Sequence, residues 1–152
     1  VSLEDSSIHP YSLYLGSVPN PELAKRGVMQ FRKKGISPYA VKLELSKGVW
    51  YRIYAGAYAD QQEGEKLIRE RNLRDAEVVK TPWANLIGVY SSSGEVESRA
   101  RHLRDLDYFP YVVTCSDGAK RLYVGAFYEK ERAEGLHEEL KAKGIDAQTV
   151  KR

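Results

Sequence analysis

Arginine and tyrosine occur close together in two short stretches of the chain that read alike. The first stretch, YRIYAGAY, contains Arg52 and Tyr54, and the second, RLYVGAF, contains Arg121 and Tyr123. Side chains alternate between the two faces of a β-strand, so each arginine shares a face with its tyrosine. A tyrosine ring offers a flat apolar surface with a polar edge, and a guanidinium offers a planar fork for carboxylates. The two stretches therefore predict a surface that binds a ligand carrying both kinds of group.

The strands that carry these pairs belong to a repeat. Gly16 and Gly88 occupy similar apolar stretches 72 positions apart, and Pro38-Tyr39 recurs at the same shift as Pro110-Tyr111. Apolar residues on the alternate positions of the two arginine strands predict a core on their other face: Ile53, Ala55, Leu122 and Val124. Similarity that recurs in order over about 70 residues indicates a duplicated unit.

Each repeat has the pattern of a β-α-β-β-α-β unit. In the first repeat we expect strands at residues 11–18, 39–45, 49–58 and 76–80 and helices at 22–34 and 63–72. In the second we expect strands at 83–90 and 147–150, helices at 95–106 and 129–143, and a hairpin around Asp117-Gly118. This predicts an α+β protein of two tandem ferredoxin-like (RNP-like) repeats, each a four-stranded antiparallel sheet with two helices on one face. We expect a tail at 1–9, the repeats at 10–80 and 83–152, and a chain that is part of a longer protein.

The other face of each sheet is left open by this arrangement. In the first repeat, Ser12 and Tyr14 on the first strand join Arg52 and Tyr54 on the third, because these two strands are neighbours at the centre of a ferredoxin-like sheet. The second repeat has Leu86 in the place of Tyr14, so its Arg121 and Tyr123 lack the same surroundings.

The repeat resembles the SPOR domain. The stretch YSLYLGSV is similar to the family's opening strand, aromatic-x-V-Q-L-G-S-F, and YRIYAGAY is similar to its third strand, Y-R-V-x-V-G-P-F. The resemblance extends over both repeats as a tandem pair, and it adds Ser17 to the expected site. It implies a non-catalytic module outside the cytoplasmic membrane that binds peptidoglycan glycan strands stripped of stem peptides and targets an envelope or cell-division protein to the septum. Envelope or division proteins are further expected partners, and any membrane attachment would come through regions outside this chain.

The chain departs from the family pattern at several positions. The family's glutamine is Tyr14 in the first repeat and Leu86 in the second. Its serine is retained as Ser17 but becomes Val89, and the proline of G-P-F is alanine in both repeats. The first repeat is therefore predicted to be the better-preserved site.

Composition narrows the classes of function. The net charge of +3 is small for a dedicated DNA-binding protein, and one cysteine excludes an internal disulfide and a cysteine-based zinc site. The three histidines have no metal-binding spacing, and no catalytic constellation is evident. We therefore expect no metal, no cofactor and no enzymatic activity.

Three other interpretations of the open face stay possible at this stage. RNA-recognition domains also place aromatic and basic residues on the central strands of such a sheet, although the near-neutral charge and the late glycines argue against nucleic acid. The faces could instead bind a protein partner. They could also be solvated surfaces on which tyrosine and arginine are good strand formers.

Overall fold

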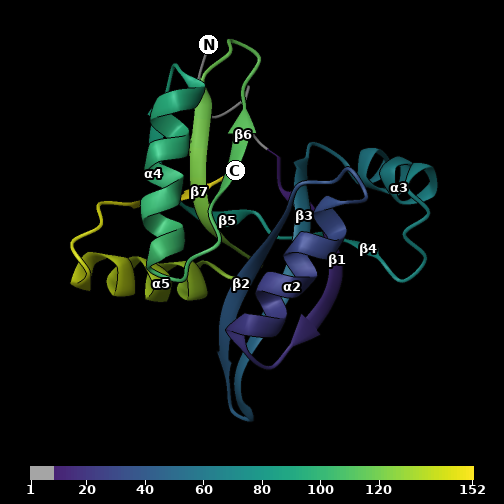
Figure 1. Cartoon of the computed structure of the whole chain (residues 1–152), viewed down its shortest axis with the longest axis horizontal. Coiled ribbons are helices and arrows are strands. Elements are labelled where there is room, and N and C mark those ends of the chain that lie inside the picture. The colour runs from purple at the N-terminus through teal and green to yellow at the C-terminus, as the bar shows by residue number, and fades with distance from the viewer. Residues whose placement is uncertain (1–8) are drawn as a thin grey trace. The chain divides into compact units, whose positions relative to one another are not determined.

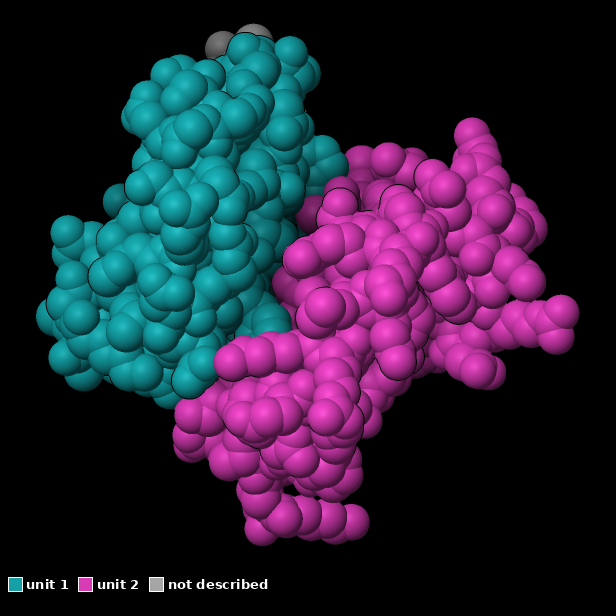
Figure 2. All heavy atoms as spheres, in the orientation of Figure 1, with its two compact units in different colours: residues 1–10, 81–152 teal, residues 11–80 magenta. Residues whose placement is uncertain are grey.

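The computed structural model describes residues 9–152 and divides into two compact units (Figures 1 and 2). The first unit in the order of the chain is residues 11–80, magenta in Figure 2, and the second is residues 81–152 with residues 9–10, teal in Figure 2. Apart from His9, the tail expected at 1–9 lies outside the described residues.

The first unit contains a four-stranded antiparallel sheet in the order β2-β3-β1-β4. Its elements in chain order are β1 (Tyr11–Val18), α2 (Pro21–Arg32), β2 (Pro38–Leu45), β3 (Gly48–Tyr58), α3 (Gln61–Glu70) and β4 (Glu77–Lys80).

The second unit repeats this topology, with the sheet order β6-β7-β5-β8. Its elements are β5 (Trp83–Tyr90), α4 (Ser93–Asp105), β6 (Tyr111–Thr114), β7 (Lys120–Phe127), α5 (Lys130–Ala142) and β8 (Gln148–Lys151). The predicted fold class, two ferredoxin-like units with central strands β1–β3 and β5–β7, is confirmed.

Side-chain caps fix where three of the helices begin. Asn20 Oδ1 accepts a hydrogen bond from Leu23 N at 2.9 Å at the start of α2, and Pro21 occupies the first helical position. Asp60 caps α3 and Ser92 caps α4 in the same way. The Ser92 hydroxyl also donates to the Glu95 carboxylate at 3.2 Å, which completes a reciprocal pair.

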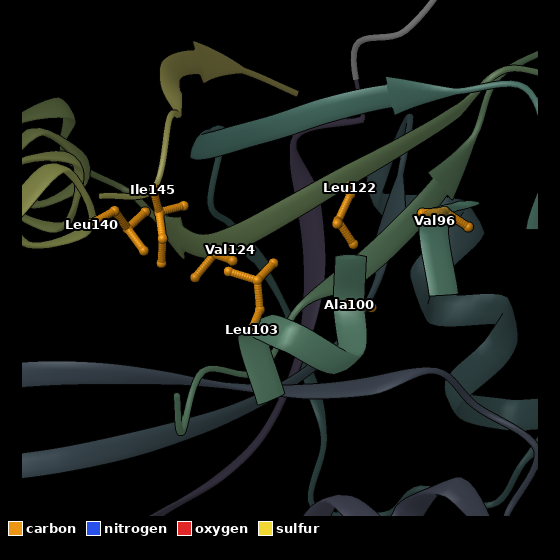
Figure 3. Close-up of a cluster of buried hydrophobic side chains, with 7 residues drawn as sticks. All are labelled: Val96, Ala100, Leu103, Leu122, Val124, Leu140 and Ile145. Carbon is orange, nitrogen blue, oxygen red and sulfur yellow. The ribbon is translucent and has the colours of Figure 1, made fainter. Parts of the chain in front are cut away.

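Each sheet buries one face under its two helices. In the first unit Leu13 and Ala55 pack with Ile36 and Leu73, and with partly buried side chains of both helices. In the second unit Leu122 and Val124 of β7 pack against Val96, Ala100 and Leu103 of α4 and Leu140 of α5 (Figure 3). The core positions predicted on β3 and β7 are thus confirmed, and the arginine-tyrosine pairs belong to the opposite face.

A β-bulge in the first strand of each unit changes which residues share a face. Tyr14 pairs with Tyr54, but the next pair is Gly16 with Ile53, so Leu15 is an extra residue. Leu15 packs toward the core, and Ser17 then pairs with Arg52. Strict alternation would put Tyr14 and Ser17 on opposite faces, whereas the bulge brings both to the open face. The same shift occurs between Leu86 and Gly88 of β5.

Candidate functional site

A row of three tyrosines crosses the face of the first sheet that its helices leave uncovered, which is called the open face although Tyr39 and Tyr54 are themselves buried. Tyr39 of β2 pairs with Tyr54 of β3, which pairs with Tyr14 of β1. The ring centroids of Tyr39 and Tyr54 are 6.1 Å apart, and those of Tyr54 and Tyr14 are 5.9 Å apart at an interplanar angle of 57°. These separations are in the favourable range for tilted aromatic pairs. The row holds the ring of Tyr14 in a defined orientation.

Hydrogen bonds of hydroxyl groups fix Tyr39, at the end of the row opposite Tyr14. The Tyr39 hydroxyl donates to the Gly56 carbonyl oxygen at 2.9 Å and lies 3.0 Å from Ser12 Oγ. Ser12, Tyr39 and Tyr54 are buried. Their arrangement gives Ser12 and Tyr54 a supporting role under the residues that reach solvent.

The polar residues of the face lie beside Tyr14. The Tyr14 hydroxyl and Ser17 Oγ are 2.6 Å apart, and Arg52 is the cross-strand partner of Ser17. Ser17 and Arg52 are exposed and Tyr14 is half-buried. Burial raises the pKa of the Tyr54 hydroxyl, and the neighbouring Arg52 guanidinium offsets part of that rise. The rim formed by Tyr14, Ser17 and Arg52, here called the first rim, therefore combines a ring, two hydroxyls and a permanent positive charge.

The second unit keeps the tyrosine pair but lacks the ring and the serine of this rim. Tyr111 of β6 stacks on Tyr123 of β7 at 5.7 Å and 27°. Leu86 occupies the next place in the row. Arg121, half-buried, pairs with Val89. The position of the first rim thus holds one arginine and two apolar side chains.

In the second unit, the hydroxyl of Tyr111 has partly different hydrogen-bonding partners from those of Tyr39. The Tyr111 hydroxyl donates to the Gly125 carbonyl oxygen at 2.6 Å, as Tyr39 does to Gly56. The buried Arg152 donates to the Tyr111 hydroxyl at 3.1 Å and to Thr81 Oγ1 at 2.7 Å. Arg152, which follows the last strand, therefore contacts Tyr111, whereas the counterpart of Tyr111 in the first unit, Tyr39, contacts Ser12.

Burial and charge act on the second pair as on the first. Burial raises the pKa of the Tyr123 hydroxyl, and the adjacent Arg121 guanidinium lowers it in part. In each unit, an arginine thus lies close enough to a buried tyrosine of the same strand to lower its pKa.

The predicted site residues fall into two groups. Ser12, Tyr14, Ser17, Arg52 and Tyr54 come together on the first sheet, whereas Arg121 and Tyr123 belong to the second. Sequence reasoning missed Tyr39, the second residue of β2, and Tyr111, the first residue of β6. The sequence feature that could have identified them is the Pro-Tyr dipeptide, which occurs at 38–39 and again 72 positions later at 110–111.

Residues 9–152 contain neither a cluster of metal-binding side chains nor a membrane-spanning helix. No group of three or more histidine, cysteine, aspartate or glutamate side chains in this range is placed to hold a metal ion. No helix in the same range combines the length and the apolar character needed to cross a bilayer.

Residues 9–80 match the family model described as the SPOR domain. The match covers slightly less than half of the chain, and it coincides with the first unit and its rim. SPOR domains are peptidoglycan-binding rather than catalytic modules, so the match supports a binding function for these residues at the level of the family. The tandem arrangement rests on the repeated sheet topology and not on the family model. No curated protein and no solved structure gives a significant match to the chain.

Proposed function

We propose that the open face of the first unit binds peptidoglycan glycan strands, preferably strands without stem peptides, and that the first rim makes the contact. The single observation that carries this proposal is the convergence of Tyr14, Ser17 and Arg52 on the face opposite the helices. The module is non-catalytic in this proposal, and it acts outside the cytoplasmic membrane to bring an envelope or cell-division protein to the septum.

The chemistry of the rim suits such a ligand. The C–H-lined face of a pyranose can lie on the Tyr14 ring, which Tyr54 supports from the next strand at 5.9 Å. The Tyr14 and Ser17 hydroxyls, 2.6 Å apart, can exchange their mutual hydrogen bond for bonds to sugar hydroxyls. Arg52 can form a bidentate pair with the lactyl carboxylate of muramic acid, which is free when the stem peptide has been removed. The preference for stripped strands then follows from one guanidinium.

In this proposal the second unit is a diverged copy with a weak glycan site or none. It retains Arg121 and Tyr123, but Leu86 and Val89 offer a sugar neither the ring nor the serine of the first rim. Its apolar rim is better suited to packing or to a protein partner than to a hydrated sugar chain.

The test is retention of the whole chain on sacculi. Purified chain is incubated with sacculi treated with an amidase, which removes stem peptides, and with untreated sacculi, and bound protein is recovered by sedimentation. We expect stronger retention on the treated sacculi, weakened by Arg52→Ala and unaffected by Arg121→Ala. Absence of retention on both preparations would refute glycan binding. Retention on single-stranded RNA with a steep dependence on salt would instead assign the face to nucleic acid.

A further inference from the structure

The second unit leaves part of one sheet edge uncovered. Strand β8 pairs with β5 only from Trp83 to Leu86. Strand β5 continues to Tyr90, and β7 pairs with it on the other side up to that residue. Among the described residues, no strand pairs with residues 87–90 on the β8 side. Backbone groups on such an edge can pair with an added extended chain.

A cavity of about 480 Å³ lies along this free edge. Residues 86–89 of β5 form one wall, and the end of α5 with residues 145–148 forms the rest. The lining includes apolar side chains, among them Leu86, Val89 and Ile145. A cavity of this size can hold one large side chain and the end of a short chain.

The polar side chains of the cavity have no partners among the residues that the structure describes. Nδ1 of His137 is buried, and no hydrogen-bonding partner for it occurs in residues 9–152. In the same range the side chains of Lys141, Asp146 and Gln148 form no hydrogen bond or ion pair. Lys141, Asp146 and Gln148 are exposed and can be solvated, whereas buried polar atoms are normally hydrogen-bonded, so it is the unpartnered Nδ1 of His137 that points to a ligand.

The first unit does not build the same wall. Its helix α3 has 10 residues, whereas α5 has 13 and extends to Ala142. The additional helical turn brings Lys141 to the cavity. The free strand edge is common to both units, because β4 pairs with β1 only from Tyr11 to Tyr14, whereas the wall that carries Lys141 belongs to the second unit.

We propose that this cavity and edge bind the carboxyl end of an extended protein segment. The segment adds as a strand to residues 87–90 of β5, and its last side chain, an apolar one, enters the cavity. Its terminal carboxylate accepts hydrogen bonds from Lys141 and His137, while Asp146 and Gln148 bond to its backbone N–H groups. One cation and one anion in the lining make the site suited to a chain end and not to a polyanion. This site is independent of the glycan face of the first unit.

The test uses the whole chain, labelled with ¹⁵N, and an acetylated tetrapeptide Thr-Val-Thr-Leu with a free carboxylate. The same peptide as its C-terminal amide is the control for the carboxylate. We expect the free acid to shift the backbone amide signals of residues 87–90 and 145–148. Lys141→Ala should weaken binding about fivefold, as expected for one partly exposed ion pair. Arg132→Ala is the matched control, because it removes an exposed positive charge from the same helix.

Three results would overturn the proposal. The first is the absence of shifts at peptide concentrations up to about 1 mM, a level that detects weak complexes. The second is equal binding of the acid and the amide. The third is binding only of an acetylated peptide ending in D-alanine, which would assign the cavity to a cell-wall stem peptide. Each of these results leaves sedimentation with stripped sacculi unchanged, so failure here is distinguishable from failure of the glycan proposal.

Discussion

Exchanging the rim residues between the two units gives the sharpest test of how glycan recognition is built. The double substitution Tyr14→Leu/Ser17→Val gives the first unit the residues that the second unit carries at Leu86 and Val89. The same fold already accommodates these residues at these places, so we expect the variant to fold. Arg52 stays in place, and the change therefore isolates the ring and the hydroxyls.

The magnitude of the effect can be worked from the contacts that are lost. The Tyr14–Tyr54 ring pair at 5.9 Å contributes about 1 kcal/mol to the stability of the unit, since such pairs contribute about 0.5–1.5 kcal/mol. For a unit of this size that loss lowers the melting temperature by about 4–8 °C. Binding loses one ring contact and two hydroxyl contacts, each worth about 1 kcal/mol, so affinity should fall about 150-fold.

The assay is co-sedimentation with amidase-treated sacculi across protein concentrations, with thermal unfolding recorded in parallel by circular dichroism. The reciprocal variant, Leu86→Tyr/Val89→Ser, places the missing groups next to Arg121 in the second unit. It should add a second class of binding sites. If the first variant is less stable but retains full affinity, the rim is a packing feature and our account of recognition is wrong.

Three further predictions concern tyrosines and glycines of the two units. Tyr39→Phe removes the hydroxyl that donates to a main-chain carbonyl, and it should lower the free energy of unfolding by about 1–3 kcal/mol, measured by urea denaturation. Burial raises the pKa of Tyr58 from 10.0 to about 12; the folded state thus holds this proton more tightly than the unfolded chain, so stability is complete below pH 10 and falls as the pH rises toward 12. Melting temperatures across this range should fall less steeply for Tyr58→Phe. Gly125→Ala would place a methyl group 2.6 Å from the Phe127 ring at a φ of +86°, which should destabilise the second unit by about 2–4 kcal/mol, whereas Gly144→Ala, at a φ of +76° with open space around it, should cost about 1 kcal/mol in the same denaturation experiment.

Periodicity was sufficient to predict the fold because both units follow it closely. The alternation around Ile53 and Leu122 correctly separates the helix-covered face from the open one. The recurrence of Gly16 as Gly88 gives the repeat and hence the topology.

The site was harder to predict because it depends on an exception to that periodicity. Residue alternation alone sends Ser17 to the helix side, and only the extra residue at Leu15 returns it to the face of Tyr14. A bulge depends on how two strands pair, so the spacing of residues within one strand does not predict it. The supporting role of Tyr39 was missed for a related reason, because its contacts with Gly56 and Ser12 join positions 17 and 27 residues apart.

The two units show which parts of this surface belong to the fold and which can vary. In both, a tyrosine at the start of the second strand stacks near a tyrosine of the third and donates to the carbonyl of a glycine with positive φ. That glycine, Gly56 or Gly125, ends the regular part of the strand, so the hydroxyl contact fixes the strand where it would otherwise be irregular. The tyrosine pair is therefore explained by structure alone, and its duplication does not by itself indicate two ligand sites.

What differs between the units is the rim: Tyr14 and Ser17 in one, Leu86 and Val89 in the other. The rim is the part of this face that differs between the units and carries the exposed Ser17, so we expect a difference in glycan binding between the units to be decided there. The arginine common to both would contact the carboxylate in either unit and would not distinguish them.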